Sequence, residues 1–357
     1  MIGIEEVAGI LVNTLFKGGV YALLAIGFSL IFGVARMLNL AHTAFYMLAA
    51  YALYACTQLL GLDPVSSIVL ALVVAFLMSV GTYSLFVLFR LPSIVSIILS
   101  VVIALLLVWF GTGFILGMGK DVPLVKAIIL PVIFSIFIAG GAYKLFIDRI
   151  REHQVTVLLI TLALAMVFQE YMLLVPAFGG HYLGAPSFIP GYWEIIGVKV
   201  TYQHLLTFGA VLVVLAGVWA LLSKTKLGIA IRATAQDTEV ANLMGIDVSR
   251  ILLIVMGIAS ALAAIAGVLV APTLVLEPHM WMSPFVMIMA IVVLGGLGSI
   301  KGSFIGAFIL ALVEVLVVYL LPEGAFLKGA FALAVMVGVL VFRAEGLFGV
   351  AFEEERL

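Results

Sequence analysis

The sequence predicts an all-α protein, a polytopic bundle of about 11 membrane-spanning helices that forms a single domain over residues 1–357. Apolar residues make up 66% of the chain and charged residues only 10%, whereas a soluble domain carries about 25% charged residues. Long stretches without a charged residue recur, including 65–89, 91–119, 251–276 and 280–300. A helix needs roughly 20 apolar residues to cross the hydrocarbon core. These stretches follow one another too closely for a separate soluble domain.

Gly and Pro turn signals separate eleven predicted spans. The spans cover residues 8–33, 41–60, 65–89, 93–117, 123–143, 155–176, 202–222, 251–271, 281–298, 302–321 and 326–342. The segment 281–298 could instead be re-entrant, which would reverse the orientation of the spans after it.

Lys and Arg gather on the cytoplasmic side of membrane proteins. If the N-terminus lies outside and the C-terminus in the cytoplasm, twelve of the 17 Lys and Arg residues are cytoplasmic and four are external. Glu5 and Glu6 stand where a cleaved signal peptide would carry positive charge. The first span is therefore expected to remain as a membrane helix.

Several classes of function are disfavoured. A net charge of −1 without a Lys/Arg cluster gives no reason to expect a nucleic-acid partner. A single cysteine, Cys56, excludes an intrachain disulfide and a multi-cysteine metal site, and no metal is expected. The stretch from Gly295 to Ser303 lacks the Gly-Lys-Ser/Thr ending of a phosphate-binding loop. We therefore expect no cofactor on this chain and no ATP hydrolysis by it.

The longest cytoplasmic connection, residues 223–250, has the pattern of an ordered segment. Thr234 followed by Asp237 resembles a capping box and predicts a helix over 235–244, and Gly245 stands where a left-handed C-cap belongs. Its apolar face would consist of Val240, Leu243 and Met244. Such a helix could dock into a groove of a partner or lie at the membrane interface.

Three stretches carry a resemblance to a known family: residues 228–245, Asn39–His42 and Leu294–Gly302. They resemble the permease subunits of ABC importers for branched-chain amino acids. The segment from Gly228 to Gly245 is similar to their coupling-helix loop, Asn39-Leu-Ala-His42 to their Asn-Phe-Ala-His segment, and Leu294–Gly302 to their Gly-Gly-x-Gly-Ser signature. The resemblance covers residues 12–60 and roughly 132–345. The predicted spans within about 65–117 look like a helix pair additional to a typical member.

The resemblance implies a permease subunit in a prokaryotic cell membrane, without catalytic residues of its own. It would work with separate ATPase subunits that bind ATP, a second permease subunit of the same or a sister kind, and an external solute-binding protein. Related permeases carry leucine-type amino acids, amides or urea. The residues implied in ATPase coupling are Arg232, Thr234, Asp237, Glu239, Ala241, Leu243 and Gly245.

Polar residues inside predicted spans are candidates for the translocation pathway, because charges at depth are costly and face a partner or a wet cavity. Lys17 could pair with Glu170 or Glu314, or Lys17 and Glu170 could snorkel to the interface. Asn39 and His42 could line the pathway or only cap the second span. In an alternative reading, Glu170 or Glu314 carries protons in an ion-gradient-driven secondary transporter.

Glycines in the signature segment predict close helix packing. Gly298, Gly302 and Gly306 recur every four residues, a spacing that lets helices approach closely in lipid. Gly295 and Gly296 could break a helix and expose backbone groups to a cavity. The external segment 178–200, with Tyr192 and Trp193, is expected to anchor at the headgroups.

Overall fold

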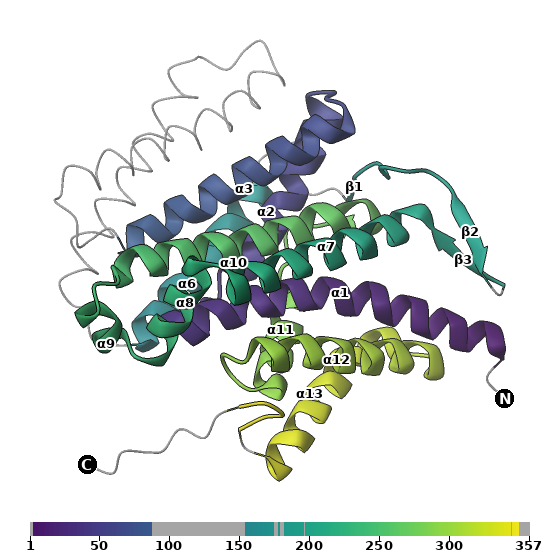
Figure 1. Cartoon of the computed structure of the whole chain (residues 1–357). Coiled ribbons are helices and arrows are strands. Elements are labelled where there is room, and N and C mark those ends of the chain that lie inside the picture. Colours follow the sequence, from purple (N-terminus) through teal and green to yellow (C-terminus); the bar gives the residue numbers. More distant parts are fainter. Residues whose placement is uncertain are drawn as a thin grey trace.

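A computed structural model describes residues 3–87, 154–174, 178, 182–195, 197–343 and 345–349. Helices dominate the described part, as predicted (Figure 1). They are α1 (Ile4–Ala35), α2 (His42–Tyr54) with a π-helical continuation (Ala55–Leu59), α3 (Pro64–Val87), α6 (Gln154–Leu174), α7 (Tyr202–Lys224), α8 (Lys226–Gln236), α9 (Thr238–Leu243), α10 (Val248–Val270) with a 3-10 turn (Ala271–Thr273), α11 (Met282–Gly295), α12 (Ile300–Leu320) and α13 (Gly324–Phe342).

Nine of the eleven predicted spans coincide with described helices, while those at 93–117 and 123–143 lie outside the described residues. Among the described residues, five helices are long and apolar enough to cross a membrane: α1, α7, α10 with its 3-10 turn, α12 and α13. Helix α11, in the segment that could be re-entrant, has 14 residues and is about 21 Å long. It is therefore shorter than a hydrocarbon core of about 30 Å.

The described helices alternate in direction. The start of α1 packs beside the β2–β3 hairpin (Tyr192–Ile195 and Val198–Thr201), where Gly197 contacts Glu5 (Figure 1). At the opposite end of α1, Gly33 contacts Gly298 in the turn between α11 and α12. Thus α11 runs in the same direction as α1, and α12 runs back.

Two small antiparallel sheets were not predicted. Strand β1 (Leu183–Gly184) pairs with β4 (Val275–Leu276), and β2 pairs with β3. The strands are two to four residues long, too short to show the alternation that marks a strand in sequence. The described part of the chain is still mostly helical, as predicted, and these short strands are an addition to it.

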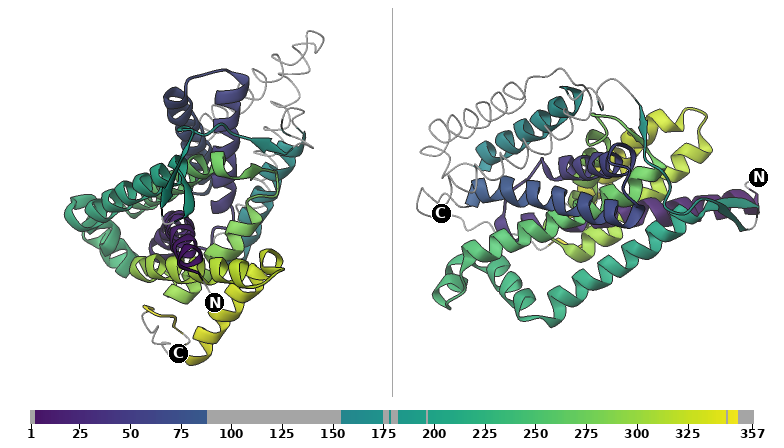
Figure 2. Two further views of the ribbon diagram at one scale, coloured as in Figure 1. Left: turned by 90° about the vertical axis from the view of Figure 1, so that its right-hand side faces the viewer. Right: turned by 90° about the horizontal axis from the view of Figure 1, so that it is seen from above.

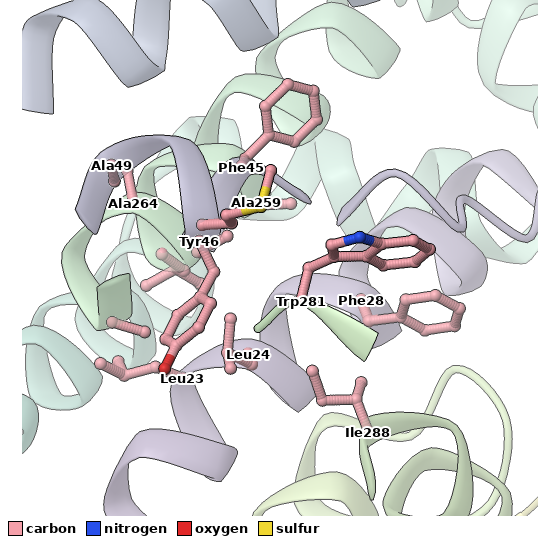
Figure 3. Packing of buried hydrophobic residues seen from close by; sticks show 14 of the residues in the cluster. Leu23, Leu24, Phe28, Phe45, Tyr46, Ala49, Ala259, Ala264, Trp281 and Ile288 are labelled. Carbon is pink, nitrogen blue, oxygen red and sulfur yellow. The ribbon is translucent and has the colours of Figure 1, made fainter. Parts of the chain in front are cut away.

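The core surrounds α2, whose residues from His42 to Leu53 are all buried. Figure 3 shows residues of α2 (Phe45, Tyr46 and Ala49) packed among residues of α1 (Leu23, Leu24 and Phe28), α10 (Ala259 and Ala264) and α11 (Ile288), with Trp281 directly before α11. On α10, a Cβ at Gly267 would overlap the Tyr46 carbonyl oxygen. A missing side chain therefore sets the close approach of α10 to α2.

Helices α7 and α13 lie at the margin of the bundle (Figure 2). Both expose large apolar side chains. Val213 and Trp219 on α7 and Phe326 and Val341 on α13 are all more than half exposed. Faces of this kind are stable against lipid tails but not against water.

Candidate functional site

Helix α8 folds back against the end of α7. The Thr225 hydroxyl caps α8 by accepting the Gly228 amide at 3.0 Å, and the Arg232 guanidinium donates to the Leu222 carbonyl oxygen. A Cβ at Gly228 would overlap the backbone carbonyls of Leu221 and Leu222. Helix α8 is therefore fixed to α7 through backbone contacts.

The helix predicted over 235–244 begins later than expected. Thr234 is buried inside α8, where its hydroxyl donates to the Ala230 carbonyl at 2.9 Å, so its assignment as the cap is wrong. Asp237 is the cap instead: its Oδ1 accepts the amides of Glu239 (2.8 Å) and Val240 (3.0 Å). Since the backbone of Asp237 is extended, it separates α8 from α9.

The C-terminal end of α9 has the predicted glycine cap. Gly245 adopts a φ of 87°, its amide bonds the Asn242 carbonyl at 3.0 Å, and the Ile246 amide bonds the Ala241 carbonyl at 3.0 Å. This is the Schellman pattern. Both ends of the six-residue α9 are thus closed by specific hydrogen bonds.

The apolar face of α9 has no cover in the described part of the chain. Leu243 is 86% exposed, Met244 78% and Val240 54%, while Ala241 is buried against the protein. Glu239 is exposed next to this face. Helix α9 forms a tip at the end of the molecule opposite the β2–β3 hairpin (Figure 1), so the three side chains, here called the α9 face, are open to a partner.

The glycines of the signature segment hold α11 and α12 together, as predicted. Gly295 and Gly302 are in backbone contact that leaves no room for a Cβ at either residue, and a Cβ at Gly306 would lie 2.9 Å from the Ile291 carbonyl oxygen. Helix α11 ends at Gly295, and Gly296 has a φ of 100°. The predicted helix break is confirmed, and close packing explains these glycines.

A C-terminal segment that sequence analysis missed closes the end of α11. The amides of Leu347 and Phe348 donate to the carbonyls of Leu294 (2.8 Å) and Gly295 (3.0 Å). These are among the carbonyls that a helix leaves without partners at its C-terminus. Backbone hydrogen bonds leave no side-chain signature that could have predicted this contact.

A buried carboxylate joins α1, α12 and α13. Glu314 is 1% exposed; its Oε1 accepts Lys17 Nζ at 3.0 Å and Lys328 Nζ at 3.2 Å, and its Oε2 accepts the Tyr21 hydroxyl at 2.7 Å. The expected pairing of Lys17 with a glutamate is confirmed for Glu314. The contribution of Lys328 was missed, although its position just past the α12–α13 turn places it at the level of Glu314.

The other glutamate at depth, Glu170, lies apart from this cluster. It is exposed on α6, and its Oε1 accepts the neighbouring Gln169 side chain at 3.4 Å. Gln169 in turn accepts the buried Trp281 indole N–H at 2.9 Å.

The connection from α1 to α2 is irregular and lies deep in the protein. His42 Nε2 bonds the Leu24 carbonyl at 3.1 Å, and the His42 ring lies against Gly27. Because Leu24 and Gly27 are 8 to 11 residues before the end of α1, α2 starts about 12–17 Å above that end.

Three polar atoms at the start of α2 are buried without a hydrogen-bond partner among the described residues: Asn39 Nδ2, His42 Nδ1 and Thr43 Oγ1. Asn39 Oδ1 accepts the Ala41 amide at 3.0 Å. An orphaned buried donor or acceptor costs about 1–3 kcal/mol, so three of them within five residues call for a functional explanation.

Comparison with known proteins gives one consistent family. The family model described as "Branched-chain amino acid transport system / permease component" matches residues 10–121 and 116–340. The high-affinity branched-chain amino acid transport system permease protein BraD of Pseudomonas aeruginosa is 28% identical over 340 residues, covering 95% of this chain and 94% of the relative. Its Escherichia coli counterpart LivH is 26% identical over 346 residues, covering 94% of each chain.

A third relative matches this chain over a shorter stretch. The probable branched-chain amino acid transport permease protein LivH of Methanocaldococcus jannaschii is 33% identical over 149 residues, covering 40% of this chain and 47% of the relative. No solved structure matches the chain.

Proposed function

Because this chain belongs to the family of permease components of branched-chain amino acid transport systems, we propose that it carries a branched-chain amino acid inward across the membrane. It is a multi-pass protein of a prokaryotic cell membrane and the permease of an ABC importer. The proposal adds the solute, which the printed names of BraD and LivH support.

The uncovered α9 face is the observation that carries the proposed coupling to ATP. Three apolar side chains on a capped helix, Val240, Leu243 and Met244, are costly in water and suit a helix docked in a partner's groove. We assign that groove to an ATPase subunit. Arg232 and Glu239 would flank the contact, and Asp237 and Gly245 would keep α9 in shape.

A movement of α9 would be transmitted to the membrane spans through the two helices next to it in the chain, α8 and α10. Helix α8 on one side is fixed to α7 by the Arg232–Leu222 hydrogen bond. On the other side Asp247 caps α10 by accepting the Arg250 amide at 3.1 Å. Because α10 packs tightly on α2 at Gly267, a shift of α9 would be transmitted to the centre of the bundle.

The start of α2 is the proposed part of the pathway. Irregular backbone at membrane depth is tolerated where it is buried in protein or lines a cavity. The unpartnered atoms of Asn39, His42 and Thr43 would meet solute or water when α10 moves away from α2.

The remaining subunits follow from the same proposal. ATP binds to the ATPase partners, and this chain holds no cofactor and performs no catalysis. A second permease subunit completes the membrane part, and an external solute-binding protein docks on the face that carries the β2–β3 hairpin. The N-terminus then lies outside and the C-terminus in the cytoplasm.

The ion-gradient-driven alternative is not favoured. The carboxylate of Glu314 is already occupied by two ammonium groups and a hydroxyl, and Glu170 is exposed at the side of the bundle. Neither glutamate is placed with Asn39 and His42 at the irregular connection.

Reconstitution tests the proposal. The permease, co-purified with its ATPase subunits and placed in proteoliposomes, is expected to accumulate labelled leucine only when ATP and the binding protein are both supplied. Leucine uptake driven by a proton or sodium gradient without ATPase subunits would contradict it.

A further inference from the structure

The cluster of Lys17, Lys328 and Glu314 carries one more positive charge than negative. Both ammonium groups bond the same carboxylate oxygen, at 3.0 and 3.2 Å. Among the residues that the structure describes, no second carboxylate forms an ion pair with either lysine. Two cations and one anion leave a net charge of about +1 within the helical bundle.

This excess charge faces outward. The side chain of Lys17 is 33% exposed and that of Lys328 is 38% exposed, whereas Glu314 is 1% exposed. Each ammonium group has three N–H donors and donates one to Glu314. The remaining donors therefore point away from the buried carboxylate, toward the surroundings of the protein.

The cluster lies close to the turn between α12 and α13. Glu314 lies six residues before the end of α12, and Lys328 lies four residues after the start of α13. At 1.5 Å per residue these positions are about 9 Å and about 6 Å from the turn between the two helices. A lysine stem can lie along apolar surface at this depth while its ammonium group reaches the polar zone.

Charged groups in spans face a partner or water, and Glu314 is the only carboxylate paired with either lysine among the described residues. We propose that Lys17 and Lys328 together bind the phosphate of an anionic phospholipid. A phosphodiester offers several acceptor oxygens to the free N–H donors, and long lysine side chains can reach toward the zone in which lipid phosphates lie. Glu314 then acts as the positioning residue that holds both lysines on one side.

Lipid binding by purified variants tests this assignment. The protein is stripped of lipid in detergent and exposed to equal amounts of phosphatidylglycerol and phosphatidylcholine, and native mass spectrometry counts the bound lipids. Lys328→Gln and Lys17→Gln each leave Glu314 paired with the other lysine, so both variants should fold. Lys199→Gln is the matched control, because Lys199 is a lysine near the same end that stacks on Tyr192.

Wild type and the Lys199→Gln variant are expected to bind phosphatidylglycerol in preference to phosphatidylcholine. In Lys17→Gln and Lys328→Gln, the ratio of bound phosphatidylglycerol to bound phosphatidylcholine is expected to fall at least fivefold. An unchanged preference in both Lys17→Gln and Lys328→Gln would overturn the proposal. So would millimolar inorganic phosphate that displaces the lipid, since free phosphate would then be the ligand. If Lys17→Gln and Lys328→Gln instead lose dimers and keep their lipid binding, the anion that faces the two lysines belongs to a second copy of this chain, for example to its Glu170. That result would also overturn the proposal.

Discussion

Removal of the α9 cap is the most specific perturbation of the proposed coupling. Asp237→Ala deletes the acceptor of two backbone amides, those of Glu239 and Val240. Loss of such a cap costs about 1 kcal/mol, which is about a fivefold change in a local equilibrium. A six-residue helix has little stability of its own, so α9 would be unfolded for a much larger part of the time.

The consequence should appear in coupling rather than in folding. Asp237 is exposed and α9 is small, so the thermal unfolding of the isolated permease should change little. Retention of the ATPase subunits during purification, and solute-stimulated ATP hydrolysis in liposomes, should each fall severalfold. Asp237→Asn is the control, because asparagine caps as well as aspartate. Wild-type coupling of the alanine variant would refute the reasoning, and equal failure of both variants would show that charge, not capping, matters.

Three further perturbations test the packing and the buried charges. Gly302→Val should lower the melting temperature by several degrees, because its side chain would overlap the α11 backbone. Gly338→Val, with open space around the glycine, should leave the melting temperature unchanged. Equal melting temperatures of the two variants would contradict the contact. Glu314→Gln should lower the yield of assembled complex more than Lys17→Met does. The reason is that Glu314→Gln leaves two ammonium groups without a counter-charge. Equal yields of the two variants would argue against the shared carboxylate. Leu347→Pro removes an amide that caps α11. The segment that follows α13 would then be held less firmly, so proteolysis at the end of α13 should become faster. Unchanged cleavage would show that the contact adds no stability.

Sequence reasoning succeeded where one residue type dictates local geometry. The absent Cβ atoms of Gly302 and Gly306 are enough to predict close helix packing, and Gly245 is enough to predict a left-handed cap. Gly298 does not continue the helical repeat, because it lies in the turn before α12 with a φ of 80° and contacts Gly33 of α1. It failed between Thr234 and Asp237: both are residue types that cap helices, but aspartate ranks above threonine as a cap. The Arg232–Leu222 hydrogen bond and the packing of Gly228 fix α8 on α7, and α8 continues to Gln236, past Thr234.

Contacts between distant parts of the chain were the harder part. The Lys17–Glu314 pair could be proposed because both charges lie in apolar spans, but Lys328 lies near a helix end, where a charge needs no partner, and it was one of the four Lys and Arg residues counted as external. Leu347 and Phe348 bind through backbone amides, which every residue but proline carries. The two- to four-residue strands carry too few positions for an alternating pattern.

Cross-linking from the α9 face tests the central claim most directly. Leu243→Cys, in a Cys56→Ala background, places a single thiol at the most exposed apolar residue of α9. In the assembled complex this thiol is expected to cross-link to an ATPase subunit, with a yield that changes when ATP binds. Val213→Cys on the exposed, membrane-facing side of α7 should give no such product. A thiol at residue 243 that reacts only with reagents added outside the cell, or reaches no ATPase subunit, would contradict the account.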